Sequence, residues 1–204
     1  MSSFEDGDAI QSKAACAVAA LCFAVWCWVA MLFTHEIGHV VAAKITGGQI
    51  TELELRPGVL SHTLVQPNPR PSIVLWSGFL SGWVLPLLTF PLWRIERGLI
   101  GPAVRLWAGF CLLVGGVYLA IGGAERFTDT GQLAAIGWPL WMLVLIGGAV
   151  GALGYWWLRR AWQALLKTIC RSGVSWRAAI GWIAFAAGWC VAQQVLFAFL
   201  KLTA

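Results

Sequence analysis

Two histidines and a glutamate lie within five residues of one another in an apolar part of the chain. The stretch LFTHEIGHVV contains His35, Glu36 and His39, and no other charged or histidine residue occurs between Lys13 and Lys44. On a helix, residues four apart lie on the same face, so both imidazoles can reach one metal ion. Glu36 is turned by about 100° from His35, which places its carboxylate beside the metal, where it can accept a proton from water.

The His-Glu-x-x-His spacing predicts a metal site because a chance occurrence would be rare and costly. With three histidines in 204 residues, random placement gives this pattern on the order of once per thousand such chains. An ionisable side chain in lipid costs about 2.5 kcal/mol or more unless it is paired or functional. Gly38, inside the motif, lets another backbone approach, either to complete the site or for ordinary helix packing.

The remaining sequence is typical of a multi-pass membrane protein. Hydrophobic residues make up 59% of the chain and charged residues 11%, too little charge to cover a water-soluble globule of this size. Its fourteen tryptophans suit helix ends at the bilayer interface. We therefore expect an all-α polytopic membrane protein, a single domain over residues 1–204. Apolar runs that could cross a hydrocarbon core of about 30 Å occur at roughly 14–45, 72–93, 102–124, 137–158 and 177–200.

Three segments outside these runs have another character. Residues 1–13 form a polar N-terminal tail, and residues 159–176 place apolar and basic residues at helical spacing, which predicts a basic interfacial segment. Between the first two runs, Ile50, Leu53 and Leu55 are spaced among polar residues, a Pro-Gly turn follows, and Val59 to Val65 looks extended. This pattern predicts a short β-hairpin.

Charge and cysteine content narrow the classes of partner. The net charge of +5 is spread over short loops. We interpret these charges as signals of membrane topology and as contacts with the headgroups of the lipid bilayer, and we expect no nucleic acid partner. The six cysteines lie mostly within apolar runs without a Cys-x-x-Cys pair, so we expect small buried residues and no disulfide framework.

A catalytic zinc site normally takes three protein ligands and leaves a position open for water. The candidates for the third ligand are His62 in the predicted hairpin, and Glu125 and Asp129 after the third apolar run. The chain crosses the membrane twice between His39 and Asp129, so both residues reach the same membrane face. His62 also lies on that face, so the number of membrane crossings does not decide between His62 and Asp129.

These motifs together resemble the site-2 protease family of intramembrane zinc metalloproteases, and in particular its compact bacterial branch without a PDZ domain. The resemblance covers about residues 30–135: the HEIGH motif at the end of an early apolar helix, the continuation VVAAKITGG, an extended stretch, and a later aspartate in TDTGQL. It implies one Zn²⁺ per chain, held by His35, His39 and Asp129, with Glu36 as the catalytic general base.

The resemblance also implies the reaction and its substrate. The enzyme would hydrolyse a peptide bond in or near the transmembrane segment of a membrane protein, single-span or signal-like, in the bacterial cytoplasmic membrane. That segment would unwind and pair as a strand with the hairpin edge that contains Gln49, Thr51, Leu53 and Leu55. The alternative is a non-enzymatic zinc-bearing membrane scaffold or metal carrier. Transporters usually place polar groups in several spans, whereas the second and fourth apolar runs carry no charge.

The sequence departs from the family pattern in two places. Thr128-Asp129-Thr130-Gly131 stands where the family usually has Asn-Pro-Asp-Gly or Leu-Asp-Gly, and the supporting Gly-x-x-x-Asn element is replaced by a segment in which Gly78 and Gly82 form Gly-x-x-x-Gly. We interpret these two glycines as sites of close helix packing.

Asp129 has a second interpretation, as the N-cap of a helix, because Gln132 follows at the third position as in a capping box. A cap uses one carboxylate oxygen and leaves the other for metal, so we favour the ligand role. His62, between Ser61 and Thr63, suits a surface or substrate contact, and Glu125 beside Arg126 suits solvation.

Two arguments about orientation conflict. A cytoplasmic N-terminus places nine Lys and Arg side chains inside and five outside, which the positive-inside rule favours. The family resemblance implies the reverse, with the zinc site toward the cytoplasm, and we slightly favour that orientation.

Overall fold

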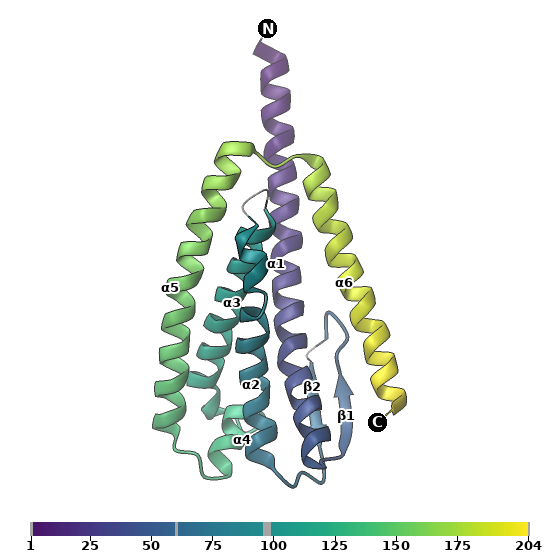
Figure 1. The fold of residues 1–204 in the computed structure, drawn as a ribbon, viewed down its shortest axis with the longest axis vertical. Coiled ribbons are helices and arrows are strands. Elements are labelled where there is room, and N and C mark those ends of the chain that lie inside the picture. Colours follow the sequence, from purple (N-terminus) through teal and green to yellow (C-terminus); the bar gives the residue numbers. More distant parts are fainter. Residues whose placement is uncertain (1, 60, 96–98, 204) are drawn as a thin grey trace.

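The chain forms an elongated helical bundle with one small β-sheet, seen in a computed structural model that describes residues 2–59, 61–95 and 99–203 (Figure 1). The side chains of residues 2–12, 171–172 and 202–203 are outside this description. In chain order the elements are α1 (Ser2–Thr46), β1 (Ile50–Glu54), β2 (His62–Val65), α2 (Pro71–Leu87), the 3-10 helix η1 (Phe90–Arg94), α3 (Ile100–Ile121), the 3-10 helix η2 (Gly122–Ala124), α4 (Asp129–Ala135), α5 (Leu140–Ser172) and α6 (Trp176–Thr203).

Five of the described helices are long and apolar enough to cross a membrane, which makes this a multi-pass membrane protein and confirms the predicted all-α polytopic fold. The predicted hairpin is also present, between the first and second spans. The spans agree with the apolar runs in the sequence to within a few residues, except at the end of the fourth. They cover Lys13–Thr46, Pro71–Arg94, Ile100–Ala124, Leu140–Cys170 and Trp176–Lys201.

The basic segment after the fourth apolar run is not a separate helix. α5 continues to Ser172 and has 33 residues, about 50 Å at 1.5 Å per residue. No glycine or proline interrupts residues 155–172, and Ala161 and Leu165 remain buried against α3. The predicted polar tail is likewise the start of α1 from Ser2 onward, although its side chains are outside the described ones.

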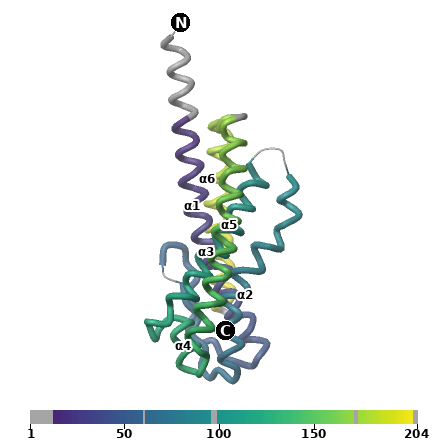
Figure 2. Tube along the Cα trace, turned by 90° about the vertical axis from the view of Figure 1, so that its left-hand side faces the viewer, coloured from purple at the N-terminus to yellow at the C-terminus, as the bar shows by residue number. Residues whose placement is uncertain are grey.

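α1 runs through the middle of the bundle, and its C-terminal end lies near α4 and the hairpin (Figures 1 and 2). α5 and α6 meet at the opposite end and diverge toward the α4 end, with the hairpin between α1 and α6 (Figure 1). α1 ends at Thr46 and is followed by Gly47, whose φ of 77° is in the left-handed region that glycine adopts readily after a helix. The N–H of Gly48 then bonds the carbonyl of Ala43 at 2.8 Å, which turns the chain into β1.

Serine hydroxyls and a glycine bring α1 and α2 close together. Ser77 Oγ donates to the Gly38 carbonyl at 2.9 Å, and Ser81 Oγ donates to the Thr34 carbonyl at 2.7 Å. A Cβ on Gly38 would lie 2.2 Å from the Ser77 carbonyl oxygen, so any larger residue would push the helices apart. The predicted backbone approach at Gly38 is therefore present, and it holds α2 against the His-Glu-x-x-His face of α1.

Small residues also join α3 to α5. A Cβ on Gly116 would lie 2.4 Å from the backbone nitrogen of Gly151, and one on Gly154 would lie 2.3 Å from that of Leu113. Such close backbone contact is the usual means of helix association in membranes, where burial of apolar surface gives little driving force between helices. This packing fixes α3, whose C-terminal end leads to Asp129.

Candidate metal centre

The two histidines of the motif lie one turn apart on α1 and face the same space. Their ring centroids are 4.8 Å apart and the ring planes are nearly perpendicular. His39 is almost fully buried and His35 partly so. The helical geometry expected from the four-residue spacing is thus realised in the buried interior of the bundle.

Asp129, the first residue of α4, brings a carboxylate to these rings from the far end of α3. Its Oδ2 lies 2.8 Å from His35 Nε2 and 3.4 Å from His39 Nε2, and the two nitrogens are 3.2 Å apart. A tetrahedral zinc ion with bonds of about 2.0–2.1 Å separates its ligands by about 3.3 Å. The three atoms therefore fit the ligand positions of one such ion.

A hydrogen bond sets the tautomer of His39. Its Nδ1 lies 2.7 Å from the carbonyl oxygen of Val74 on α2. Because a carbonyl only accepts, Nδ1 must carry the proton, and the lone pair of Nε2 then points toward His35 and Asp129. A backbone carbonyl in this position is the usual partner of a metal-ligating histidine.

Hydrogen bonds to Tyr118 on α3 and a cap by Thr128 fix the backbone around Asp129. The Asp129 N–H donates to the hydroxyl of Tyr118 on α3 at 3.3 Å, and Thr130 Oγ1 donates to the Tyr118 carbonyl at the same distance. The N-cap of α4 is Thr128, whose Oγ1 accepts from the Gly131 N–H at 3.0 Å. The capping interpretation of Asp129 is therefore wrong by one residue, and the Asp129 carboxylate is free of that role.

The electrostatic environment keeps this carboxylate ionised. Burial by itself would raise the pKa of Asp129. In the metal-free site, hydrogen bonds from protonated Nε2 atoms of His35 and His39 and the positive charge that these protons bring outweigh burial and hold the pKa well below its usual range. A bound metal ion would take the place of those protons. An ionised carboxylate is the form that binds a metal ion.

The other two candidates for the third ligand, His62 and Glu125, lie away from His35 and His39. His62 on β2 lies with its Nε2 3.2 Å from Glu52 Oε1 on β1, and Glu125 is exposed in the loop after η2. Within the described part of the chain, His35, His39 and Asp129 are the one group of three metal-binding side chains that comes together.

Glu36 is outside this group of three and is held by a residue that the sequence did not single out. Thr63 on β2 donates its hydroxyl to Glu36 Oε2 at 2.8 Å, and Glu36 is only 5% exposed. The hairpin thus orients the carboxylate next to the histidines. Among the described residues a hydrogen bond is found only to Oε2 of Glu36, which leaves Oε1 for a proton.

Of the two glycines in α2, only Gly78 is in close contact. A Cβ on Gly78 would lie 2.4 Å from His39 Nε2, whereas one on Gly82 would meet no atom within 4 Å. Of these two positions, the close packing interpreted for both is therefore present at Gly78 alone, where the neighbours are the two imidazoles of the candidate metal centre.

Gln49 and Leu55, which flank β1 at the two ends of the predicted substrate edge, are already hydrogen-bonded. The Gln49 N–H donates to the Pro67 carbonyl at 3.1 Å, and the Gln49 carbonyl accepts from Gln66 at 2.8 Å. At the other end the carbonyl of Leu55, a fully buried residue, accepts from Gln193 Nε2 on α6. Thr51 and Leu53 lie between these fixed ends, in the part of β1 whose outer edge pairs with no other described strand.

The turn of the hairpin begins with a local ion pair. Glu54 accepts hydrogen bonds from the side chain and backbone of Arg56, which lower the pKa of the Glu54 carboxyl to about 2. The carboxylate therefore stays charged at any pH near neutrality.

An apolar cavity of about 690 Å³ lies between α1, α6 and this turn, lined in part by Trp28, Leu32 and Val59. Two polar atoms in its wall, Ser61 Oγ and Gln193 Oε1, are buried without a hydrogen-bond partner among the described residues. One can donate a hydrogen bond and the other can accept one.

Comparison with known proteins identifies no relative of this chain. The chain matches no protein-family model, no curated protein and no solved structure.

Proposed function

We propose that the protein is an intramembrane zinc metalloprotease, which hydrolyses a peptide bond in or near the transmembrane segment of a membrane-protein substrate, in the bacterial cytoplasmic membrane. The observation that carries the proposal is the convergence of His35, His39 and Asp129 within 3.4 Å of one another, with Glu36 buried beside them. Ionisable side chains, which cost free energy when they face lipid, therefore lie together inside the bundle.

The donor set fits zinc. Two neutral imidazoles and one carboxylate are a known catalytic combination, which leaves a fourth position for water or substrate. A bound zinc ion would acidify water and polarise the scissile carbonyl.

The chain's own residues supply the proton transfer. Glu36, held at one oxygen by Thr63, would accept the proton of the attacking water and deliver it to the leaving amine. Val74 and Tyr118 would keep His39 and Asp129 in place during this step.

A peptide main chain suits the surroundings of β1. An extended segment could pair with the unpaired edge near Thr51 and Leu53, since added strands bind chiefly through main-chain hydrogen bonds. The neighbouring cavity offers a donor at Ser61 and an acceptor at Gln193 within apolar walls. A peptide group carries the complementary acceptor and donor, and a transmembrane segment carries the apolar side chains.

The proposal is tested with purified protein, a fluorescent single-span substrate and the variant Glu36→Gln. We expect the wild type to cleave, and the variant to keep about one zinc per chain while cleavage falls by at least about 100-fold. Zinc content is measured by elemental analysis of the same samples.

Two other outcomes would contradict parts of the proposal. Loss of zinc together with activity would make Glu36 a ligand instead of the base. A wild type that binds one zinc but cleaves no member of a panel of transmembrane segments would favour the zinc-bearing scaffold or carrier.

A further inference from the structure

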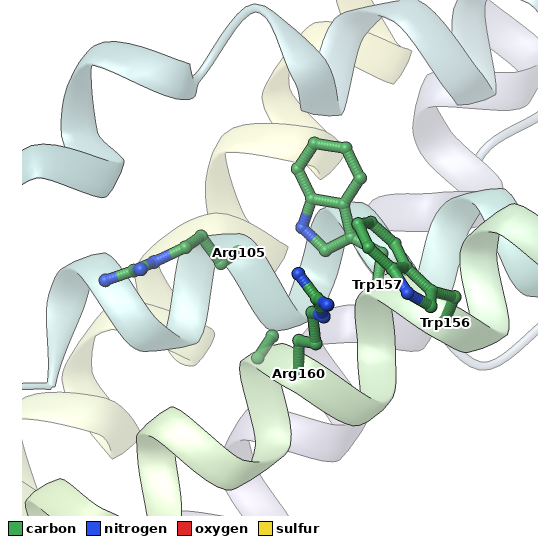
Figure 3. A pocket seen from close by; sticks show the side chains of 5 residues that line it. Arg105, Trp156, Trp157 and Arg160 are labelled. Carbon is green, nitrogen blue, oxygen red and sulfur yellow. The ribbon is translucent and has the colours of Figure 1, made fainter.

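A cavity between α3 and α5 is lined by arginine and tryptophan (Figure 3). Arg105 lies near the start of α3, whereas the candidate metal centre lies beyond the other end of that helix. It has a volume of about 320 Å³. Arg160 and the two tryptophans project from one helix, and Arg105 comes from its neighbour (Figure 3). The lining residues are Arg105, Trp156, Trp157, Arg160 and Ala161, none of which takes part in the proposed proteolysis.

Both guanidinium groups have donors to spare. Arg105 uses Nε for the Gly101 carbonyl at 3.4 Å, and Arg160 lies over the ring of Trp156 with Cζ 4.2 Å from the centroid. In the described part of the chain, neither arginine forms an ion pair with a carboxylate. Two positive charges therefore border one cavity without a protein anion to balance them.

The depth of these residues relative to the membrane points to the level of the lipid headgroups. Arg105 is five residues into α3, about 8 Å from its start, and Arg160 is twenty residues into α5, about 30 Å from its start. Since the hydrocarbon core is about 30 Å thick, both arginines can reach the same interface. Tryptophans at 156 and 157 suit that level as well.

Aromatic contacts hold the wall of the cavity in shape. The ring of Trp157 packs edge-on against Trp93, with centroids 4.9 Å apart, and Ala161 is buried at the base, where a larger side chain would fill the space. The ring of Trp156 lies against the guanidinium of Arg160. Arg160 is itself exposed, and the cavity that it lines together with Arg105 distinguishes this pair of arginines from single charges at the membrane surface.

We propose that this cavity binds the anionic phosphate group of a lipid headgroup. Guanidinium groups bind phosphate oxygens through paired hydrogen bonds, and basic pockets between transmembrane helices are suited to anionic lipids. The bound lipid would lie in the groove between α3 and α5 and join the two helices at this end. The proposal is independent of the proposed proteolysis.

The test is native mass spectrometry of delipidated protein titrated with phosphatidylglycerol or with zwitterionic phosphatidylcholine. We expect the wild type to bind the first phosphatidylglycerol molecule in preference to phosphatidylcholine. The double variant Arg105→Gln/Arg160→Gln should bind it about tenfold more weakly, since each cation near the surface contributes appreciably to anionic lipid binding. Arg159→Gln is the matched control, because Arg159 is adjacent and exposed but does not line the cavity.

Further measurements distinguish binding at this cavity from a general effect of surface charge, and a lipid ligand from free phosphate. Equal affinity of wild type and double variant, or an equal loss in Arg159→Gln, would overturn the proposal. Displacement of the lipid by micromolar inorganic phosphate would identify free phosphate as the ligand and would overturn the lipid assignment. Arg160→Lys keeps the charge but not the paired donors, so it should weaken lipid binding even if the double variant does not fold.

Discussion

Gly78 on α2 lies directly against the imidazole of His39 on α1. A Cβ built on Gly78 would be 2.4 Å from His39 Nε2 and 2.9 Å from His35 Cε1. These atoms belong to the rings that converge on Asp129. The missing side chain at position 78 thus makes the space in which the candidate metal centre is assembled.

We expect Gly78→Ala to weaken zinc binding by about 10- to 100-fold, the usual effect of disturbing the support of a metal ligand. The added methyl group must displace both imidazoles from their present positions. Zinc affinity is measured by competition with a chelator. Gly82→Ala is the matched control one turn along the same helix, where the methyl group meets no atom within 4 Å. Similar affinities for the two variants would show that Gly78 does not shape the site.

Asp129 should be the third zinc ligand. Asp129→Ala removes the carboxylate that groups with His35 and His39 as a possible ligand set, so zinc should fall well below one per chain and cleavage should stop. His62→Ala should keep its zinc, because His62 lies beside Glu52 instead. Both variants are checked by elemental analysis. The assignment fails if Asp129→Ala folds with full zinc while His62→Ala loses the metal.

The sequence predicted the spans and the shared helix face of His35 and His39 well because their signals are local. An apolar run of about twenty residues is sufficient evidence for a span, and the distance between His35 and His39 is fixed by the pitch of one helix. The hairpin could be predicted equally well, since the apolar residues spaced among polar ones from Ile50 to Leu55 and the Pro-Gly turn after them lie within a few residues.

The supporting contacts could not be predicted because they join distant parts of the chain. Thr63 reaches Glu36 across 27 residues, and the Val74 carbonyl reaches His39 across 35. A threonine in a strand and a backbone carbonyl carry no sequence signal for such a role. The continuation of α5 was missed for another reason, since basic residues after an apolar run are typical of an interfacial segment, whereas burial of Ala161 and Leu165 extends the helix.

Thr63 should affect catalysis without affecting the metal. Thr63→Val has nearly the same shape but cannot donate to Glu36 Oε2, so the carboxylate loses its fixed orientation. We expect cleavage to fall by about tenfold, roughly the effect of 1.4 kcal/mol on the barrier, with zinc content unchanged. Thr63→Ser keeps the hydroxyl and should recover most of the activity. Equal rates for the valine and serine variants would remove Thr63 from the mechanism.

Membrane orientation can be determined by labelling single cysteines in a cysteine-free background. Gln66, beyond β2, and Ser175, between α5 and α6, are exposed in loops that the five-span topology places on opposite faces. We expect an impermeant thiol reagent to reach Gln66→Cys from the cytoplasm and Ser175→Cys from outside, as the family-like orientation requires. The reverse pattern would favour the positive-inside count. Labelling of both from the same side would refute the five-span topology.

Gln193 should stabilise the fold by joining α6 to the end of β1. Its Nε2 donates to the carbonyl of Leu55, and both residues are buried. In Gln193→Leu that carbonyl loses its donor, and an unsatisfied buried acceptor costs about 1–3 kcal/mol. For a chain of this size we expect Tm to fall by roughly 2–12 °C, measured by thermal unfolding in detergent. Gln194→Leu, at the adjacent exposed position, should leave Tm nearly unchanged. Equal shifts in the two variants would show that the contact with Leu55 contributes nothing specific, and that α6 is held by its apolar packing on α1 alone.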